Sequence, residues 1–130
     1  MSSPVHDYDY AVVRVVPCVY REAFVPVGVV LHARRAGFLG ARLRRDPDWL
    51  AARCPNLDAA MLDRFLAAYE RVAAGGTEGG PVGLLPPSER FHWLTAPRSA
   101  AIQTSSVHTG RAPDPASVLD RLFAQHVEVA

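Results

Sequence analysis

Two apolar stretches, rich in β-branched and aromatic residues, dominate the first third of the chain. They read YDYAVVRVV (residues 8–16) and FVPVGVVLHAR (residues 24–34). Such residues favour strands because their side chains pack well on a pleated surface, so we expect a strand over each stretch. Pro17 should end regular pairing because it has no N–H to donate, Pro26 should lie on an edge or a bulge, and Gly28 indicates a bulge or a close backbone approach.

A third strand and a first helix are expected next. A tight turn at residues 36–37 leads into FLGARLRR (residues 38–45), whose alternation implies one solvated face. Asp46 is then expected to cap a helix that begins with Pro47, and Pro55 should stop it.

The strongest helical pattern lies at residues 56–76, where apolar residues recur at three- and four-residue spacing. Asn56 is the expected N-cap of this helix, and the glycines at 75–76 should end it. A Gly/Pro-rich loop follows, and Pro87 can open a short helix over residues 88–96.

The remainder of the chain is expected to add one strand and one helix. Residues 97–110 should return in extended form, and residues 114–127 should form an amphipathic helix capped by Asp114. Three strands, then helices, then a fourth strand and a closing helix indicate an α+β fold: a small antiparallel sheet of about four strands with helices packed mainly on one face.

Length and charge limit the classes of protein that this chain can belong to. Its 130 residues suit a single domain over residues 1–130, and 49% hydrophobic with 21% charged residues is typical of a globular protein. The net charge of +1 argues against nucleic acid or a membrane surface as a partner. All basic residues are arginines, and the cluster at 34–45 is interpreted either as a solvated strand face or as an anion-facing patch.

The cysteines and the N-terminus indicate a cytoplasmic protein. Cys18 and Cys54 show no metal-ligand spacing and are expected to be buried free thiols. The first residues lack the basic and apolar regions of a signal peptide, and no apolar run reaches the length of a membrane span. Localisation in the cytoplasm is therefore the default expectation.

Residues 88–110 concentrate side chains that can carry chemistry, although no standard catalytic motif is present. His92 and His108 lack the spacing of a zinc site, so no metal and no cofactor are expected. Arg90 and Arg98 could surround an anionic group with nearby hydroxyls. The alternative is structural: Glu89 pairs with one of these arginines and holds the connection to the sheet.

The sequence resembles the bacterial family of unknown function DUF3037 over nearly its whole length. The segments that carry the resemblance are YDYAVVRVVPCVYREAFVPVGVVLHAR, PPSERFHWLTAPRSAAIQTSSVHTG and the closing amphipathic helix. Pro26 departs from the family, which usually has a polar residue there. The resemblance implies no established activity or cofactor, but it implies a HipA-like kinase-fold protein as a partner encoded nearby. The matching positions are Tyr8, Arg14, Val15, Pro17, Arg21, Glu22, Phe24, Val27, Gly28, Val29, Glu89, Arg90, Trp93, Arg98, Ser99, Gln103 and residues 107–110.

Two functions follow as hypotheses, and whether the protein is an enzyme stays open. The first is a non-catalytic protein-binding or adaptor module that docks a partner on an exposed strand edge, with FVPVGVV as the apolar strand. The second is a site that binds or processes an anionic small molecule or a nucleotide-like ligand at an Arg/Trp/His cluster. The second requires the two polar regions of the chain to meet on one surface. The candidate binding residues are Arg14, Glu22, Glu89, Arg90, Trp93, Arg98, Ser99, Gln103 and His108.

Overall fold

The structure is a computed structural model that describes residues 4–16, 24–96 and 101–128. Within these residues, five strands form one antiparallel sheet in the order β3-β2-β1, with β4 and β5 both on the far side of β1. The short β4 pairs with the second half of β1, and β5 pairs with the first half. The strands are β1 (His6–Val15), β2 (Val25–Ala33), β3 (Phe38–Leu43), β4 (Ile102–Thr104) and β5 (His108–Ala112).

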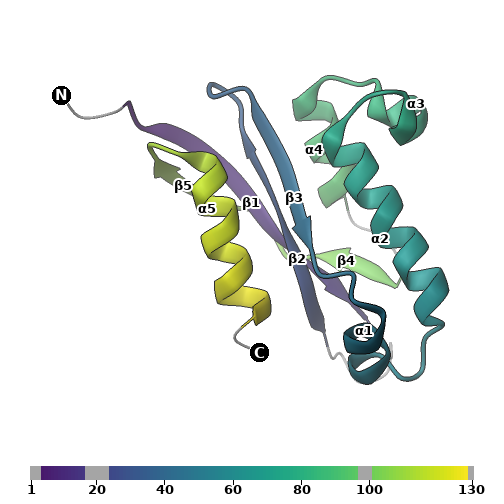
Figure 1. Ribbon diagram of the computed structural model, residues 1–130. Coiled ribbons are helices and arrows are strands. Elements are labelled where there is room, and N and C mark those ends of the chain that lie inside the picture. The colour runs from purple at the N-terminus through teal and green to yellow at the C-terminus, as the bar shows by residue number, and fades with distance from the viewer. Residues whose placement is uncertain (1–3, 17–23, 97–100, 129–130) are drawn as a thin grey trace.

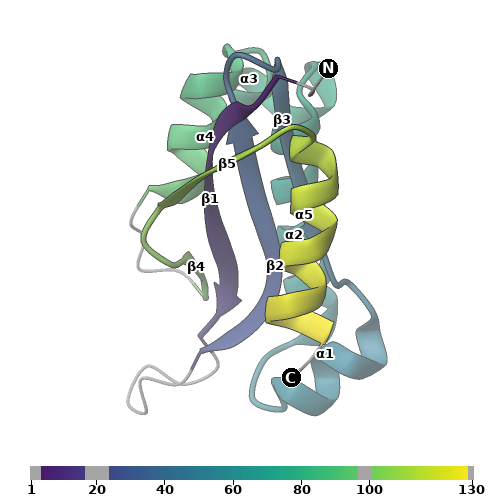
Figure 2. The same ribbon diagram turned by 90° about the vertical axis from the view of Figure 1, so that its left-hand side faces the viewer.

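Helices cover both faces of this sheet, most of them on one side (Figures 1 and 2). The helices α1, α2 and α4 lie on one face, whereas α5 lies alone on the other. The predicted α+β fold is therefore confirmed. The helices are α1 (Pro47–Arg53), α2 (Ala59–Ala74), α3 (Gly80–Gly83), α4 (Pro87–Thr95) and α5 (Pro115–Phe123), with short turns η2 (Thr77–Gly79) and η3 (Ala124–Glu128).

Strand alternation divides the apolar residues between two cores. On β1, Val13 belongs to the core under α2 and α4, whereas Tyr8 belongs to the core under α5. Successive side chains of a strand point to opposite faces. The single strand β1 therefore contributes side chains to both cores. None of the helices in the described residues has the length and the apolar run needed to cross a membrane.

The strand connections confirm two predictions made from single residues. The pairing register of β1 and β2 shifts so that Val27 has no partner, and Pro26 lies beside this bulge, past the end of the β3 ladder. A Cβ atom at Gly28 would meet the Leu43 side chain and the Arg42 carbonyl of β3. Only glycine permits that approach.

Two local predictions need correction. The N-cap of α2 is Asp58 rather than Asn56, because the Asp58 carboxylate accepts hydrogen bonds from the N–H groups of Ala60 and Met61 at 3.0 and 3.3 Å. The single returning strand expected over residues 97–110 is divided. Its described part forms β4 and β5, and the bonds between Ser105 and Val12 join the two ladders.

Candidate functional site

The residues singled out from the sequence lie in two layers of the molecule. Pairing with β1 places Gln103 opposite Arg14, and His108 opposite Tyr10, which puts all of them on the face that carries α5. In contrast, Glu89, Arg90 and Trp93 belong to α4 on the other face. Three candidates, Glu22, Arg98 and Ser99, fall outside the described residues, as does Cys18.

Arg90 is engaged in holding the fold. Its Nη1 donates to the carbonyls of Val72 and Ala73 at 3.0 and 2.7 Å, and its Nε donates to the Leu85 carbonyl at 3.0 Å. The last carbonyls of a helix have no partner within the helix and carry partial negative charge. Arg90 therefore ties α4 to the C-terminal end of α2.

Of the candidates on the α5 face, Arg14 and Gln103 lie where β4 pairs with β1, and His108 lies in the β1–β5 ladder. Arg14 donates to the Thr104 carbonyl at 3.0 Å, and its guanidinium lies 3.9 Å from the centre of the Phe24 ring. Its Nε is buried without a hydrogen-bond partner. His108 is exposed, with its ring 5.3 Å from that of Tyr10. These contacts are those of packing side chains.

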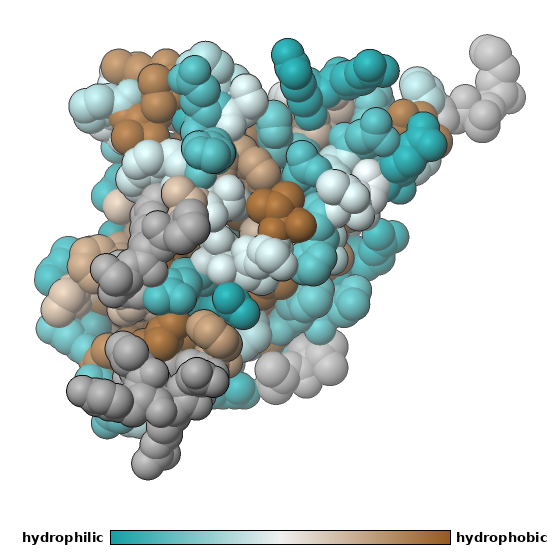
Figure 3. Space-filling model, turned by 180° about the vertical axis from the view of Figure 1, so that it is seen from behind, coloured by the Kyte–Doolittle hydropathy of each residue, from teal (hydrophilic) through white to brown (hydrophobic). Residues whose placement is uncertain are grey.

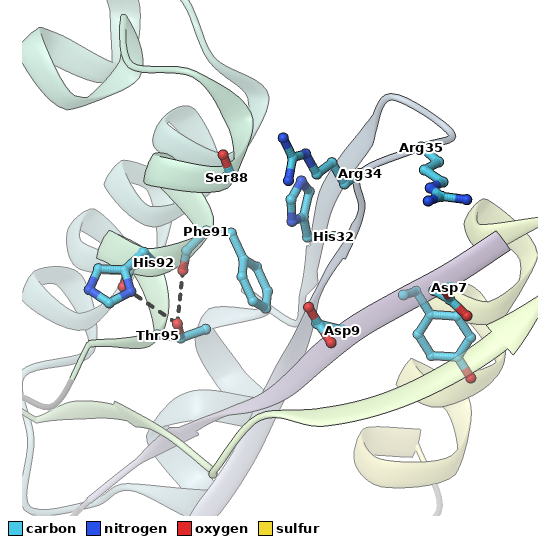
Figure 4. Close-up of a pocket in the computed structure, with 10 residues that line it drawn as sticks. Asp7, Asp9, His32, Arg34, Arg35, Ser88, Phe91, His92 and Thr95 are labelled. Carbon is cyan, nitrogen blue, oxygen red and sulfur yellow. Dashed lines mark hydrogen bonds between the residues drawn. The ribbon is translucent and has the colours of Figure 1, made fainter.

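A polar cavity of about 440 Å³ opens between α4, the first half of β1 and the β2–β3 hairpin (Figure 4). We call it the α4 pocket. Its helical wall follows one face of α4 at three- and four-residue spacing, and its sheet wall combines β1 with the end of β2. The lining residues are Asp7, Tyr8, Asp9, His32, Arg34, Arg35, Ser88, Phe91, His92 and Thr95.

Several charges in the α4 pocket have no counter-ion. Asp7 pairs with Arg111 at 2.9 Å, and both side chains are exposed. In contrast, Asp9, Arg34 and Arg35 form no ion pair with any described residue. The pocket thus presents free positive groups on the hairpin and a free carboxylate on β1.

His32 forms part of the pocket wall. It is only 8% exposed, its ring lies 5.4 Å from that of Phe91, and it makes no hydrogen bond to a described residue. Burial lowers the pKa of His32, Arg34 and Arg90 lower it further, and Asp9 opposes them. The imidazole is therefore neutral at neutral pH, with one nitrogen able to donate and the other able to accept.

The hydroxyl groups of the pocket differ in their use. Thr95 donates to the Phe91 carbonyl at 2.9 Å, so its proton is engaged within α4. Ser88 makes no hydrogen bond among the described residues, and neither histidine contacts it as a base. An activated serine requires such a base. No group of three or more metal-binding side chains occurs in the described residues.

Sequence reasoning missed the α4 pocket, although one signal for it exists. His32 is a polar residue in the otherwise apolar β2, and the register places it directly opposite Asp9 of β1. Polar residues in such positions, without a partner nearby in sequence, indicate a site rather than core. Their pairing depends on the register of β1 and β2.

The outer edge of β3 lines a second cavity, of about 400 Å³, which we call the edge groove. Its floor is Leu39–Leu43, and its wall is formed by Glu70, Ala73 and Ala74 of α2. In Figure 1 this edge faces the viewer, with α5 on one side and α2 on the other. The groove therefore gives access to a strand edge flanked by helices.

The arginine cluster at 34–45 serves different purposes along its length. Arg42 pairs with Asp120 at 2.8 Å, and Arg45 pairs with Asp63 at 2.9 Å. Hydrogen bonding to Arg45 lowers the pKa of Asp63. Arg44 lies 4.6 Å from the centre of the Trp49 ring. Arg34 and Arg35 of the hairpin, and Arg44, form no ion pair with a described residue.

Comparison with known proteins gives the family. No curated protein and no solved structure matches the chain. Residues 10–127 match a family described as "Protein of unknown function (DUF3037)". The match runs from the middle of β1 into η3 and includes the residues of the α4 pocket other than Asp7, Tyr8 and Asp9. This chain therefore belongs to the DUF3037 family.

Proposed function

We propose that the protein is a binding module that accepts an extended segment of a partner protein along the free edge of β3. The supporting observation is the hydrogen-bonding pattern of that strand. Arg44 N–H donates to the Val27 carbonyl at 2.7 Å. Bonded and non-bonded pairs alternate along an antiparallel ladder, so Leu39, Ala41 and Leu43 direct their N–H and C=O groups outward.

These outward groups have no partner among the described residues. Unpaired strand edges are templates for another strand, and proteins usually block them with proline, charge or a covering element. The charged side chain of β3 does not block this edge, since Arg42 is held by Asp120 of α5. Addition of a strand would satisfy the backbone groups and add side-chain contacts in the groove.

The size of the side chains beside the edge supports the same function. Ala73 and Ala74 of α2 line the groove, and their small side chains leave the backbone of β3 accessible. The sequence had indicated docking on the FVPVGVV strand. That strand is β2, which is paired with β1 on one side and β3 on the other. The docking edge is accordingly assigned to β3.

The alternative function, an anionic ligand bound by the Arg/Trp/His cluster predicted from sequence, has less geometric support. Trp93 of α4 and His108 of β5 lie on opposite faces of the sheet. Arg90 donates hydrogen bonds to the last carbonyls of α2 and is not free to bind a ligand. A ligand could not contact the whole described set at once.

The partner we propose to test first is the HipA-like kinase-fold protein that the family resemblance suggests. The purified chains would be mixed, and the dissociation constant measured by isothermal titration calorimetry. Ala41→Pro is the informative variant because it removes an outward N–H while the bonds to β2 stay intact. We expect a cooperative unfolding transition close to that of the wild type and the loss of partner binding.

A second pair of variants tests the groove itself. Ala74→Trp fills it, whereas Ala68→Trp places the same bulk on an exposed position of α2 outside it. Binding should fall with the first and persist with the second. Unchanged binding in both Ala41→Pro and Ala74→Trp would refute docking at this edge, and an absence of wild-type binding would refute this partner.

An apolar end of the molecule supplies a further comparison. Leu84 and Leu85 are 66% and 39% exposed, and Figure 3 shows apolar side chains gathered at the end that carries α3. Leu84→Ser should leave partner binding unchanged. Loss of binding with this variant, and not with Ala41→Pro, would place the interface at the α3 end and contradict the proposal.

A further inference from the structure

The α4 pocket carries groups suited to an oxyanion at one end. Figure 4 shows Ser88 on the helical wall and the Arg34 guanidinium extending from the hairpin toward that wall, with His32 beside Arg34, and all three line the pocket. Arg34 has no ion pair, and Ser88 has no hydrogen bond, among the described residues. All three side chains can donate a hydrogen bond to an oxygen atom.

The start of α4 adds to this environment. Its N-cap is Pro86, which makes no side-chain cap, and its first helical residue is Pro87. The earliest bond within the helix comes from Arg90 N–H to the Pro86 carbonyl at 3.0 Å. The N–H groups of Ser88 and Glu89 are therefore left without a partner in the helix, at its positive end.

His32 is the independent observation that points to a ligand. Its side chain is more than nine-tenths buried, faces the pocket and lacks a hydrogen-bond partner among the described residues. The buried unpartnered side-chain nitrogens of the described residues are Arg14 Nε and His126 Nε2, so the ring nitrogens of His32 open onto the pocket instead of being sealed in the core. A ligand in the pocket would supply the missing partner.

Asp9 extends the site in the other direction. It lies opposite His32 on β1, and Figure 4 shows it on the far side of the Phe91 ring from Ser88. An unpaired carboxylate accepts hydrogen bonds and favours a cationic donor. A cavity of about 440 Å³ has the size of a small-molecule site.

We propose that the α4 pocket binds a small metabolite with an oxyanion held by Arg34, Ser88 and His32 and an amine or hydroxyl group held by Asp9. This function is separate from docking at β3, because the edge groove and the α4 pocket share no residue. The oxyanion end sets where the ligand binds, and the carboxylate end selects among ligands.

The experiment titrates the ¹⁵N-labelled full chain with inorganic phosphate, O-phosphoethanolamine and β-alanine at constant ionic strength, and follows the backbone amides and histidine rings by NMR. Phosphate should give saturable shifts at Ser88, Glu89 and His32. Phosphoethanolamine should bind about tenfold more tightly than phosphate, the contribution expected of a charge-assisted hydrogen bond to Asp9. β-Alanine replaces phosphate with carboxylate, and its affinity relative to phosphoethanolamine identifies the preferred oxyanion.

Matched variants distinguish binding in the α4 pocket from nonspecific binding of anions to exposed arginine side chains. Arg34→Ala should raise the dissociation constant of phosphoethanolamine about tenfold or more, whereas Arg64→Ala, an exposed arginine of α2, should leave it unchanged. Asp9→Asn should remove the preference for phosphoethanolamine over phosphate. Linear, unsaturable shifts spread over the arginines with all three probes would overturn the proposal, and equal affinities for phosphate and phosphoethanolamine would refute the role of Asp9.

Discussion

Replacement of Arg90 tests how the helical layer is held together. Its guanidinium contacts three main-chain carbonyls, two at the end of α2 and that of Leu85 before α4. Hydrogen bonds that involve a charged group contribute about 1.5–3 kcal/mol each when they are well shielded. Arg90 is only half-buried, and the freed carbonyls of Arg90→Ala can regain water. We therefore expect the free energy of unfolding to fall by about 2–3 kcal/mol, including the loss of the favourable interaction with the helix dipole.

Urea denaturation followed by circular dichroism measures this loss. The midpoint should fall without a change in the slope m, since the surface exposed on unfolding stays the same. For a domain of this size the melting temperature should fall by roughly 6–15 °C, or about 3–5 °C for each kcal/mol. Glu89→Ala, at the exposed neighbouring position, is the control. A loss below about 0.5 kcal/mol in Arg90→Ala, the range of ordinary surface substitutions, would refute the reasoning.

Three further predictions concern the same layer and the α4 pocket. Tyr69→Phe removes a buried hydroxyl that donates to the Leu94 carbonyl at 2.9 Å, so urea denaturation should show a loss of about 1–2 kcal/mol, and an unchanged midpoint would contradict that bond. Gly75→Ala should cost a similar amount, about 1–2 kcal/mol, because Gly75 has φ +80° and a Cβ there would lie 2.9 Å from the Arg90 Nη1; a stable Gly75→Ala variant would show that Arg90 can move without loss. The lowered pKa of His32 means that the unfolded chain takes up the proton more readily, so the free energy of unfolding should fall as the pH drops below about 6.5, the ordinary imidazole value, until the folded pKa is reached. Denaturation at several pH values should show a smaller fall in His32→Gln, and an equal fall in both proteins would contradict this assignment.

The regular elements could be predicted because local patterns determined them. The β-branched stretches formed β1 and β2, and the three- and four-residue spacing of apolar side chains formed α2 and α5. The N-cap of α2 was missed because Asn56 and Asp58 are both good capping residues. Only the path of the chain after Pro55 decides that Asp58 bonds the first turn.

The division of the returning strand depended on contacts remote in sequence. The Ser105 side chain accepts a hydrogen bond from Val12 N–H at 2.9 Å, and the Ser105 N–H donates to the Val12 carbonyl at 2.8 Å. The serine thus occupies the junction between the two ladders. The local sequence of residues 102–112 does not indicate where this strand divides, because the division depends on how the segment pairs along β1.

The candidate site was predicted less well because its members are defined by register and layer. Two residues that are close in sequence have different surroundings: Ser88 lines the α4 pocket, whereas Arg90 contacts α2. Two residues that are remote in sequence lie side by side: Asp9 is opposite His32 in the β1–β2 ladder. Single-sequence patterns identify residue types suited to a site, but the register of β1 and β2 decides which of them share a cavity.

The two proposed binding surfaces occupy different parts of the molecule, one along the free edge of β3 and one between α4 and the face of β1 and β2, and this makes their independence testable. The edge groove follows β3, whereas the α4 pocket adjoins β1 and the far ends of β2 and α4. Both surfaces border β2 and its hairpin to β3, and the buried residues of β2 leave little freedom to move. Ala41→Pro should therefore keep the phosphoethanolamine affinity of the wild type, and Arg34→Ala should keep its partner affinity. A change of more than about threefold in the partner dissociation constant at saturating phosphoethanolamine corresponds to a coupling free energy of about 0.65 kcal/mol. Such a change would show that the two sites are energetically coupled and would contradict their independence.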